Sequence, residues 1–86
     1  MSEKIEVRKA LGVIDYIFSE GEKDGDAYVL NGLRAKSDFD GYTVTLMNDY
    51  VTLNIYFHNK FRFEYSSKKE RDQFLEKMDL LYKAKR

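Results

Sequence analysis

The chain has 86 residues, which is enough for one small domain and too few for two. Apolar residues make up 43% of it, as in folded proteins rather than disordered ones. Fifteen basic residues balance fifteen acidic ones, which argues against a protein that binds nucleic acid, because phosphate contacts call for excess Lys and Arg. We therefore expect a single globular domain over residues 1–86.

Two absences from the sequence narrow the class of protein further. There is no cysteine, which excludes disulfides, thiolate zinc sites and thiol catalysis. There is also no run of about 18 apolar residues that could span a membrane, and the charged opening Met1-Ser2-Glu3-Lys4 is not typical of a signal peptide. We expect a cytoplasmic protein without membrane contact.

The first element along the chain is a predicted helix from about Glu3 to Phe18 or Ser19. Ser2 is a suitable N-cap, because its hydroxyl can accept a bond from an amide of the first turn. Gly21 ends the helix, and a loop is expected over residues 21–26. Apolar residues recur at three- and four-residue spacing and form one stripe: Val7, Ala10, Leu11, Ile14, Ile17 and Phe18.

Three later segments alternate between apolar and polar residues, with many β-branched and aromatic side chains. They cover residues 42–47, 50–57 and 61–65. A period of two residues is typical of strands with one buried face. The sequence therefore predicts at least three consecutive strands.

The pairing register between the first two of these strands can be predicted from their apolar faces. A two-residue loop at Asn48-Asp49 pairs Leu46 with Val51 and Val44 with Leu53, apolar against apolar. Asn and Asp also tolerate the positive φ of a type I′ turn. We therefore expect a tight hairpin at this loop.

For the second hairpin, a three-residue loop, His58-Asn59-Lys60, keeps the faces matched and pairs Ile55 with Phe63. The same register places Tyr56 beside Arg62, close enough for a cation–π contact. A three-residue loop is therefore preferred to a two-residue one, which would mix the faces.

A fourth strand is expected upstream, over about residues 28–36. A four-residue loop at residues 37–40 pairs Ala35 with Tyr42, again apolar on apolar. Asn31-Gly32 interrupts this strand, and we interpret the pair as a bulge or bend.

The last element is a helix that begins at a capping box formed by Ser67 and Glu70. Its apolar stripe consists of Phe74, Leu75, Met78, Leu81 and Tyr82. The sequence thus predicts an α+β fold of two layers, α-β-β-β-β-α, in which a four-stranded antiparallel meander carries both helices on one face.

The face of the meander away from the helices is the leading candidate for function. It is expected to carry Thr45, Met47, Tyr50, Thr52, Tyr56 and Arg62. Met, Tyr and Arg are enriched at protein interfaces, although Thr-rich exposed strands are also common as plain solvated surface. The hypothesis is a protein-binding or dimerisation face, whereas base stacking by single-stranded RNA is disfavoured by the sparse basic charge.

An alternative site lies at one end of the sheet. Alternate loops of a meander share an end, so the loops that contain Asp38, Asp40, His58 and Asn59 are expected at one edge. An acidic pair beside an imidazole could bind a small ligand or divalent ion and could support catalysis. The acidic segments lack the spacing of a calcium loop, and no glycine spacing fits a nucleotide loop. We therefore assign no catalytic residue, metal or cofactor.

A resemblance supports a compact protein without assigning an activity. The segments that carry it are Gly32-Leu33-Arg34-Ala35, residues 37–43, Val51-Thr52-Leu53 and residues 56–60. They resemble a small family of bacterial proteins classed as a domain of unknown function, of about this length. The resemblance implies a short stand-alone protein and no residue role. The predicted function is a non-enzymatic protein-interaction or regulatory module that acts on a protein partner or as a homodimer.

Overall fold

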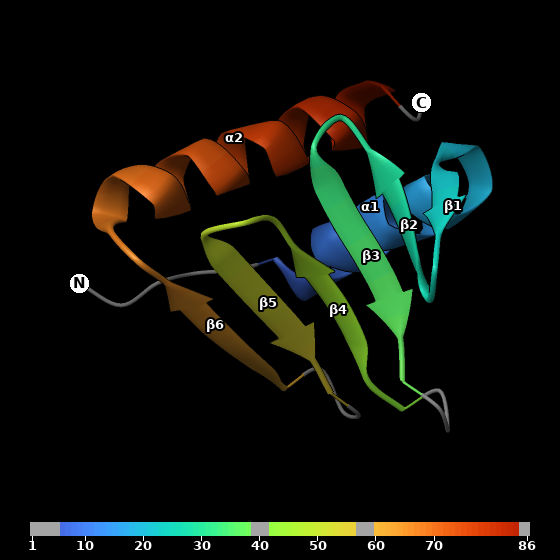
Figure 1. The fold of residues 1–86 in the computed structure, drawn as a ribbon. Coiled ribbons are helices and arrows are strands. Elements are labelled where there is room, and N and C mark those ends of the chain that lie inside the picture. Colours follow the sequence, from blue (N-terminus) through green and yellow to red (C-terminus); the bar gives the residue numbers. More distant parts are fainter. Residues whose placement is uncertain (1–5, 39–41, 57–59, 85–86) are drawn as a thin grey trace.

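The computed structural model describes residues 6–38, 42–56 and 60–84. Over these residues the chain forms two helices and one antiparallel sheet, so the predicted α+β class is confirmed (Figure 1). The elements in chain order are α1 (Val7–Glu20), β1 (Glu22–Asp24), β2 (Ala27–Leu30), β3 (Leu33–Ser37), β4 (Val44–Met47), β5 (Val51–Ile55), β6 (Phe61–Tyr65) and α2 (Lys68–Ala84).

The sheet is a meander in which each strand pairs with the next one along the chain. Its described part has six strands in the order β1-β2-β3-β4-β5-β6, so the prediction of four strands is wrong. The two additional strands come from the region between α1 and β4. There, the predicted loop contains β1 and the predicted single strand is split into β2 and β3.

The split occurs at Asn31-Gly32, which forms a tight hairpin and not a bulge. Asn31 has φ 53° and Gly32 has φ 80°, and they connect the paired residues Leu30 and Leu33. Two successive residues with positive φ make a type I′ turn, whose twist matches that of the flanking strands. The Asn-Gly pair therefore reverses the chain here.

A second short hairpin joins β1 to β2. Asp24 pairs with Ala27, so Gly25 and Asp26 form the connection, and Gly25 has φ 64°. Glycine at the first central position is typical of a type II′ turn. The predicted loop over residues 21–26 therefore contains a three-residue strand of exposed, charged residues.

The register between β4 and β5 differs from the prediction by two residues. Leu46 pairs with Leu53 instead of Val51. The cause is Asn48, whose Oδ1 accepts bonds from the amides of Tyr50 and Val51, both at 2.9 Å, while its own amide donates to the Val51 carbonyl. The turn is thus centred one residue later. Because the shift is even, the side chains within β4 and β5 keep their predicted faces.

The two neighbouring registers are also displaced by even numbers of residues. Ile55 pairs with Phe61 instead of Phe63, and Ala35 pairs with Leu46 instead of Tyr42. The loop between β3 and β4 is longer than predicted, since the Asp38 amide donates to the Thr43 carbonyl at 2.7 Å. The inward-facing residues within these strands are again the predicted ones, whereas Tyr42, also predicted inward, precedes β4 and is 64% exposed.

Local hydrogen bonds define the C-terminal end of α1 and the N-terminal end of α2. Helix α1 begins at Val7, after an extended N-cap at Glu6 that makes no side-chain capping bond. The predicted start of the helix, Glu3, and its predicted N-cap, Ser2, lie outside the described residues. At its other end the Gly21 amide donates to the Ile17 carbonyl at 2.8 Å. For α2 the predicted N-cap is confirmed, because Ser67 Oγ accepts from the Glu70 amide at 3.2 Å.

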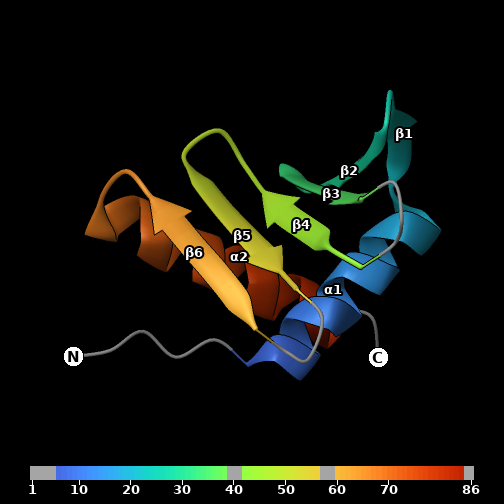
Figure 2. The same ribbon diagram turned by 90° about the horizontal axis from the view of Figure 1, so that it is seen from below.

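The core lies between the sheet and the helices. Helix α1 contacts β2, β3 and β4, helix α2 contacts β5 and β6, and the helices contact each other. Figure 2 shows both helices on the same side of the sheet. In the described part of the chain, no helix is long and apolar enough to cross a membrane. The core residues are Ala10, Val13, Ile14, Ile17, Leu33, Ala35, Leu46, Val51, Leu53, Ile55, Phe74, Met78 and Leu81.

Candidate functional site

The sheet has one face turned away from both helices, which we call the open face. Residues that are paired across neighbouring antiparallel strands share a face. One such row joins Lys36, Thr45, Asn54 and Arg62 across β3 to β6, and the next joins Arg34, Met47, Thr52 and Glu64. With the paired β2 residues, the open face comprises Ala27, Val29, Arg34, Lys36, Thr45, Met47, Thr52, Asn54, Arg62 and Glu64.

The centre of the open face is ordered by a side-chain hydrogen bond. The Thr45 hydroxyl donates to Asn54 Oδ1 at 2.7 Å across the β4–β5 pair. Thr45 is only 8% exposed, because its neighbours shield it, and Met47, Thr52 and Asn54 are half-buried. The centre is therefore a well-packed surface of small polar and apolar groups with fixed positions.

Ion pairs flank this centre. Arg62 Nε lies 2.9 Å from Glu64 Oε2 on β6, and Arg34 Nη2 lies 3.3 Å from Asp24 Oδ2, which joins β3 to β1. All four side chains are at least half exposed, so the pairs add little to stability. Their effect is to hold two guanidinium groups in place at the border of the open face.

The residues predicted for the interaction face are not all on it. The structure places Thr45, Met47, Thr52 and Arg62 on the open face, opposite the helices. Tyr50 lies in the β4–β5 turn and is 58% exposed. The hydrogen bonds that Asn48 accepts centre the turn one residue later than predicted, so the turn includes Tyr50.

Tyr56 and Arg62 are not the neighbours that the sequence predicted. Arg62 pairs with Asn54, and the Tyr56 amide donates to the Lys60 carbonyl at 2.6 Å, beyond the end of β5. The predicted pairing of Tyr56 with Arg62 is therefore wrong. The cause is the same two-residue displacement of register that moves Phe61 opposite Ile55.

Val29 and Arg34 belong to the open face, but the sequence-based prediction did not assign them to it. Their strands, β2 and β3, were interpreted as one, so no face could be assigned; the Asn-Gly signal would have separated them. Beside them is a hollow of about 190 Å³ lined by Val29, Gly32, Arg34, Met47, Asn48 and Asp49. It adjoins the open face at the end where the β2–β3 and β4–β5 turns lie.

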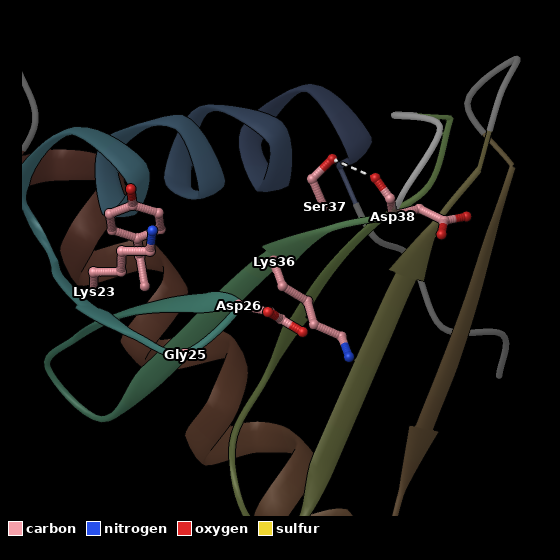
Figure 3. A pocket seen from close by; sticks show the side chains of 7 residues that line it. Lys23, Gly25, Asp26, Lys36, Ser37 and Asp38 are labelled. Atoms are coloured by element: carbon pink, nitrogen blue, oxygen red, sulfur yellow. Dashed lines mark hydrogen bonds between the residues drawn. The ribbon is translucent and has the colours of Figure 1, made fainter.

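The alternative edge is only partly described. Asp40, His58 and Asn59 lie outside the described residues. Asp38 lines a hollow of about 570 Å³ together with Lys23, Gly25, Asp26, Tyr28, Lys36 and Ser37. Figure 3 shows the charged side chains spread along this hollow, with Lys23 and Asp38 at opposite sides of the view. Among the described residues no group of three or more His, Cys, Asp or Glu could hold a metal ion.

Shifted pKa values occur away from both surfaces, at the contact between the helices. Hydrogen bonds from Lys9 and from Lys83 lower the pKa of Asp79, and the bond to Asp79 raises the pKa of Lys9. Lys9 Nζ lies 2.7 Å from Asp79 Oδ1, and Lys83 Nζ lies 3.1 Å from Asp79 Oδ2. This cluster joins α1 to α2 and has the character of a structural ion pair.

A model of a protein family matches almost the whole chain. The family model described as "Protein of unknown function (DUF3081)" matches residues 5–86. The chain belongs to this family. The predicted resemblance to a domain of unknown function is thereby confirmed. No curated protein and no solved structure matches the chain. Membership of this family assigns no activity to the chain.

Proposed function

We propose that the chain is a non-enzymatic protein-interaction module and that its open face is the contact surface for a folded protein partner. The observation that carries this proposal is the ordered centre of that face. Thr45 and Asn54 are joined by a 2.7 Å hydrogen bond, and half-buried Met47 and Thr52 lie beside them.

The layout of the open face matches the anatomy of protein interfaces. Such interfaces have a core that is poor in charge and a rim that is polar and solvated. Here the charged residues lie around the centre, as the pairs of Arg62 with Glu64 and of Arg34 with Asp24. Because the centre is formed by paired strands, little conformational entropy is lost when a partner binds.

The small hollow beside the open face supports the same proposal. Its wall includes the half-buried side chains of Val29 and Met47, and its volume is about 190 Å³. Hot spots of interfaces are commonly single anchoring side chains that fill such pockets. A partner that inserts one apolar side chain between Val29 and Met47 would gain a defined register on the face.

The proposal is tested by site-specific photo-cross-linking in the cells that produce the chain. A photoreactive residue at position 52 lies on the open face, and the same residue at position 76 lies on the exposed surface of α2. We expect one dominant protein to be captured at position 52 and not at position 76. Met47→Lys should abolish that capture, because it places a charge in the centre of the face. Equal capture at both positions, or capture that Met47→Lys leaves unchanged, would contradict the proposal.

A second candidate function is the binding of a small ligand or divalent ion at the edge that includes Asp38. It is supported by the hollow of about 570 Å³, whose lining includes the oppositely charged side chains of Asp26, Lys36 and Asp38. Binding there should shift the amide resonances of Asp26 and Asp38 on addition of Mg²⁺, Ca²⁺ or Zn²⁺, or of small zwitterions, and Asp38→Asn should remove the shifts. Spectra that do not change with any of these probes would exclude this candidate.

A further inference from the structure

Among the strands that the structure describes, β6 is an edge of the sheet, and one of its sides has no partner strand. In the described part of the chain it pairs with β5 only, and it is the outermost strand on that side (Figure 1). Its sequence is Phe-Arg-Phe-Glu-Tyr, and Phe61 is 37% exposed. A five-residue edge strand with an exposed aromatic residue is a template for pairing with another strand.

The hydrogen bonds of β6 show which backbone groups face the free side. The Tyr56 amide donates to the Lys60 carbonyl, and the Ser66 amide donates to the Tyr50 carbonyl. In an antiparallel pair, alternate residues direct their backbone groups toward the partner strand and away from it. The even-numbered residues of β6 therefore bond to β5, and the N–H and C=O groups of Phe61, Phe63 and Tyr65 point to the free side.

We propose that the free side of β6 binds β6 of a second copy of this chain, antiparallel about a two-fold axis at Phe63. In this register Phe63 is opposite Phe63 of the second copy, and Phe61 is opposite Tyr65 of the second copy. These are the residues whose backbone groups face outward, so they form hydrogen-bonded pairs. On the open face Arg62 is opposite Glu64 of the second copy, and the two-fold axis repeats that pair.

Charge complementarity favours this register over the two registers in which the axis is moved by one residue. Moving the axis to Arg62 would place two arginines opposite each other, and moving it to Glu64 would place two glutamates opposite each other. Like charges directly opposite on paired strands are destabilising, whereas opposite charges stabilise the pair. The order Arg62-Phe63-Glu64 is therefore self-complementary in one register, as a two-fold interface requires.

The other edge of the sheet does not have this property. Strand β1 has three residues, Glu22, Lys23 and Asp24, and all are exposed. Pairing β1 with a second β1 about Lys23 would place Glu22 opposite Asp24. Short and charged edge strands are a common protection against pairing. Association is thus confined to β6, and it closes as a dimer instead of extending into a filament.

This inference rests on the proposed function, because it takes protein contact as the role of the chain. It deepens that proposal by naming a second copy of the chain as one partner. A two-fold axis at Phe63 that joins the sheets edge to edge keeps both open faces on the same side. The dimer would then present two copies of the open face, with Arg62 and Glu64 at the junction between them.

The test is the molar mass in sedimentation equilibrium from micromolar to millimolar concentration. We expect a monomer–dimer equilibrium for the unaltered chain. Arg62→Glu and Glu64→Arg each turn the two attractive pairs between the copies into repulsive ones, as well as the Arg62–Glu64 pair within each chain. Each variant should therefore weaken dimerisation by about tenfold or more. The double variant R62E/E64R restores opposite charges and should restore dimerisation.

A mixture of the two single variants is the decisive experiment. A chain with glutamate at 62 and 64 is complementary to a chain with arginine at both, so the mixture should form a heterodimer even though each variant alone is weakened. Circular dichroism and the unfolding midpoint show that each variant is folded. A monomeric unaltered chain at millimolar concentration, or dimerisation insensitive to these charges, would overturn the inference. Met47→Lys, on β4, should leave the dimer intact, so loss of the dimer only in that variant would assign self-association to the open face.

Discussion

Lys9 of α1 and Asp79 of α2 form an ion pair, with 2.7 Å between Nζ and Oδ1, that joins the first and last elements of the described chain. Asp79 also accepts a bond from Lys83, one helical turn later, at 3.1 Å. One carboxylate therefore holds two cations at the helix contact. We expect Asp79→Asn to destabilise the fold, whereas Glu76→Gln, on the exposed surface of the same helix, should have little effect in the same urea unfolding experiment.

The effect of Asp79→Asn should depend on pH. The pKa of Asp79 is lowered from 3.8 by its bonds to Lys9 and Lys83, so its stabilising contribution is present above pH 3.8 and is lost as the pH falls through the lowered value. The pKa of Lys9 is raised from 10.5 by its bond to Asp79, so that contribution is lost only as the pH rises beyond 10.5. Stability curves of the two proteins should differ between these limits and converge in strong acid. A constant difference at all pH values would exclude the ion pair as its cause.

Gly21 permits the close approach of α1 to β2. A Cβ atom at this position would lie 2.6 Å from the Ile17 carbonyl oxygen and 2.8 Å from the Val29 carbonyl oxygen, both of them backbone atoms. We expect Gly21→Ala to lower the free energy of unfolding by about 1–3 kcal/mol, as overpacking does. Gly25→Ala is the matched comparison, since its Cβ would meet nothing within 4 Å and only the φ of 64° opposes it. An equal or smaller loss for Gly21→Ala would show that the backbone can move apart.

Asn48 determines the turn between β4 and β5 through its side-chain oxygen. That oxygen accepts from the amides of Tyr50 and Val51, both at 2.9 Å. Asn48→Ala should cost about 1–3 kcal/mol, because two backbone donors lose their acceptor. Asn48→Asp keeps an acceptor oxygen and should retain most of the stability in thermal unfolding. A similar loss in both variants would mean that the amide group acts in another way.

The Thr45–Asn54 bond can be removed almost without change of shape. Thr45→Val deletes the hydroxyl that donates to Asn54 Oδ1 at 2.7 Å and should lower the free energy of unfolding by about 1 kcal/mol. It should also weaken capture of the partner at position 52, because Asn54 loses its fixed orientation. Thr52→Val, on the same face, leaves the bond in place and serves as the control for stability. If the two valine variants unfold alike, the bond does not order the face.

The side-chain faces could be predicted from the sequence, whereas the registers could not. Leu46 and Leu53 are both core residues, as the two-residue period indicates. Their pairing with each other depends on where the chain turns, and that is decided by the side-chain bonds of Asn48. Because register errors of two residues leave every face unchanged, the apolar pattern cannot detect them.

The number of strands was underestimated for a similar local reason. Asn31 and Gly32 interrupt a run that is otherwise compatible with one strand. An Asn-Gly pair is a signal of a tight hairpin, and the positive φ values of both residues show that it forms one here. In β1, Glu22, Lys23 and Asp24 have no apolar face, so no periodicity marks the strand. Its formation depends on pairing with β2, which the turn at Gly25 brings alongside.

The candidate surface was predicted in part. Thr45, Met47, Thr52 and Arg62 lie on the open face because their alternation was clear. Tyr50 was misplaced with the turn. Residues of β2 and β3 were missed with the hairpin that contains them. Polar and aromatic residues near turns are therefore the ones whose position depends on details of loop geometry.

The most direct test of the open face is the amide NMR spectrum of the labelled chain, recorded before and after addition of the protein captured at position 52. We expect shifts or broadening at Thr45, Thr52 and Asn54 on the open face, and none of these changes in the Met47→Lys variant. Changes at Phe61, Phe63 and Tyr65 on raising the concentration of the chain alone would report the dimer separately. Shifts confined to Asp26, Ser37 and Asp38, with the open face unaffected, would contradict the proposed contact surface and favour a ligand site at the edge of the sheet.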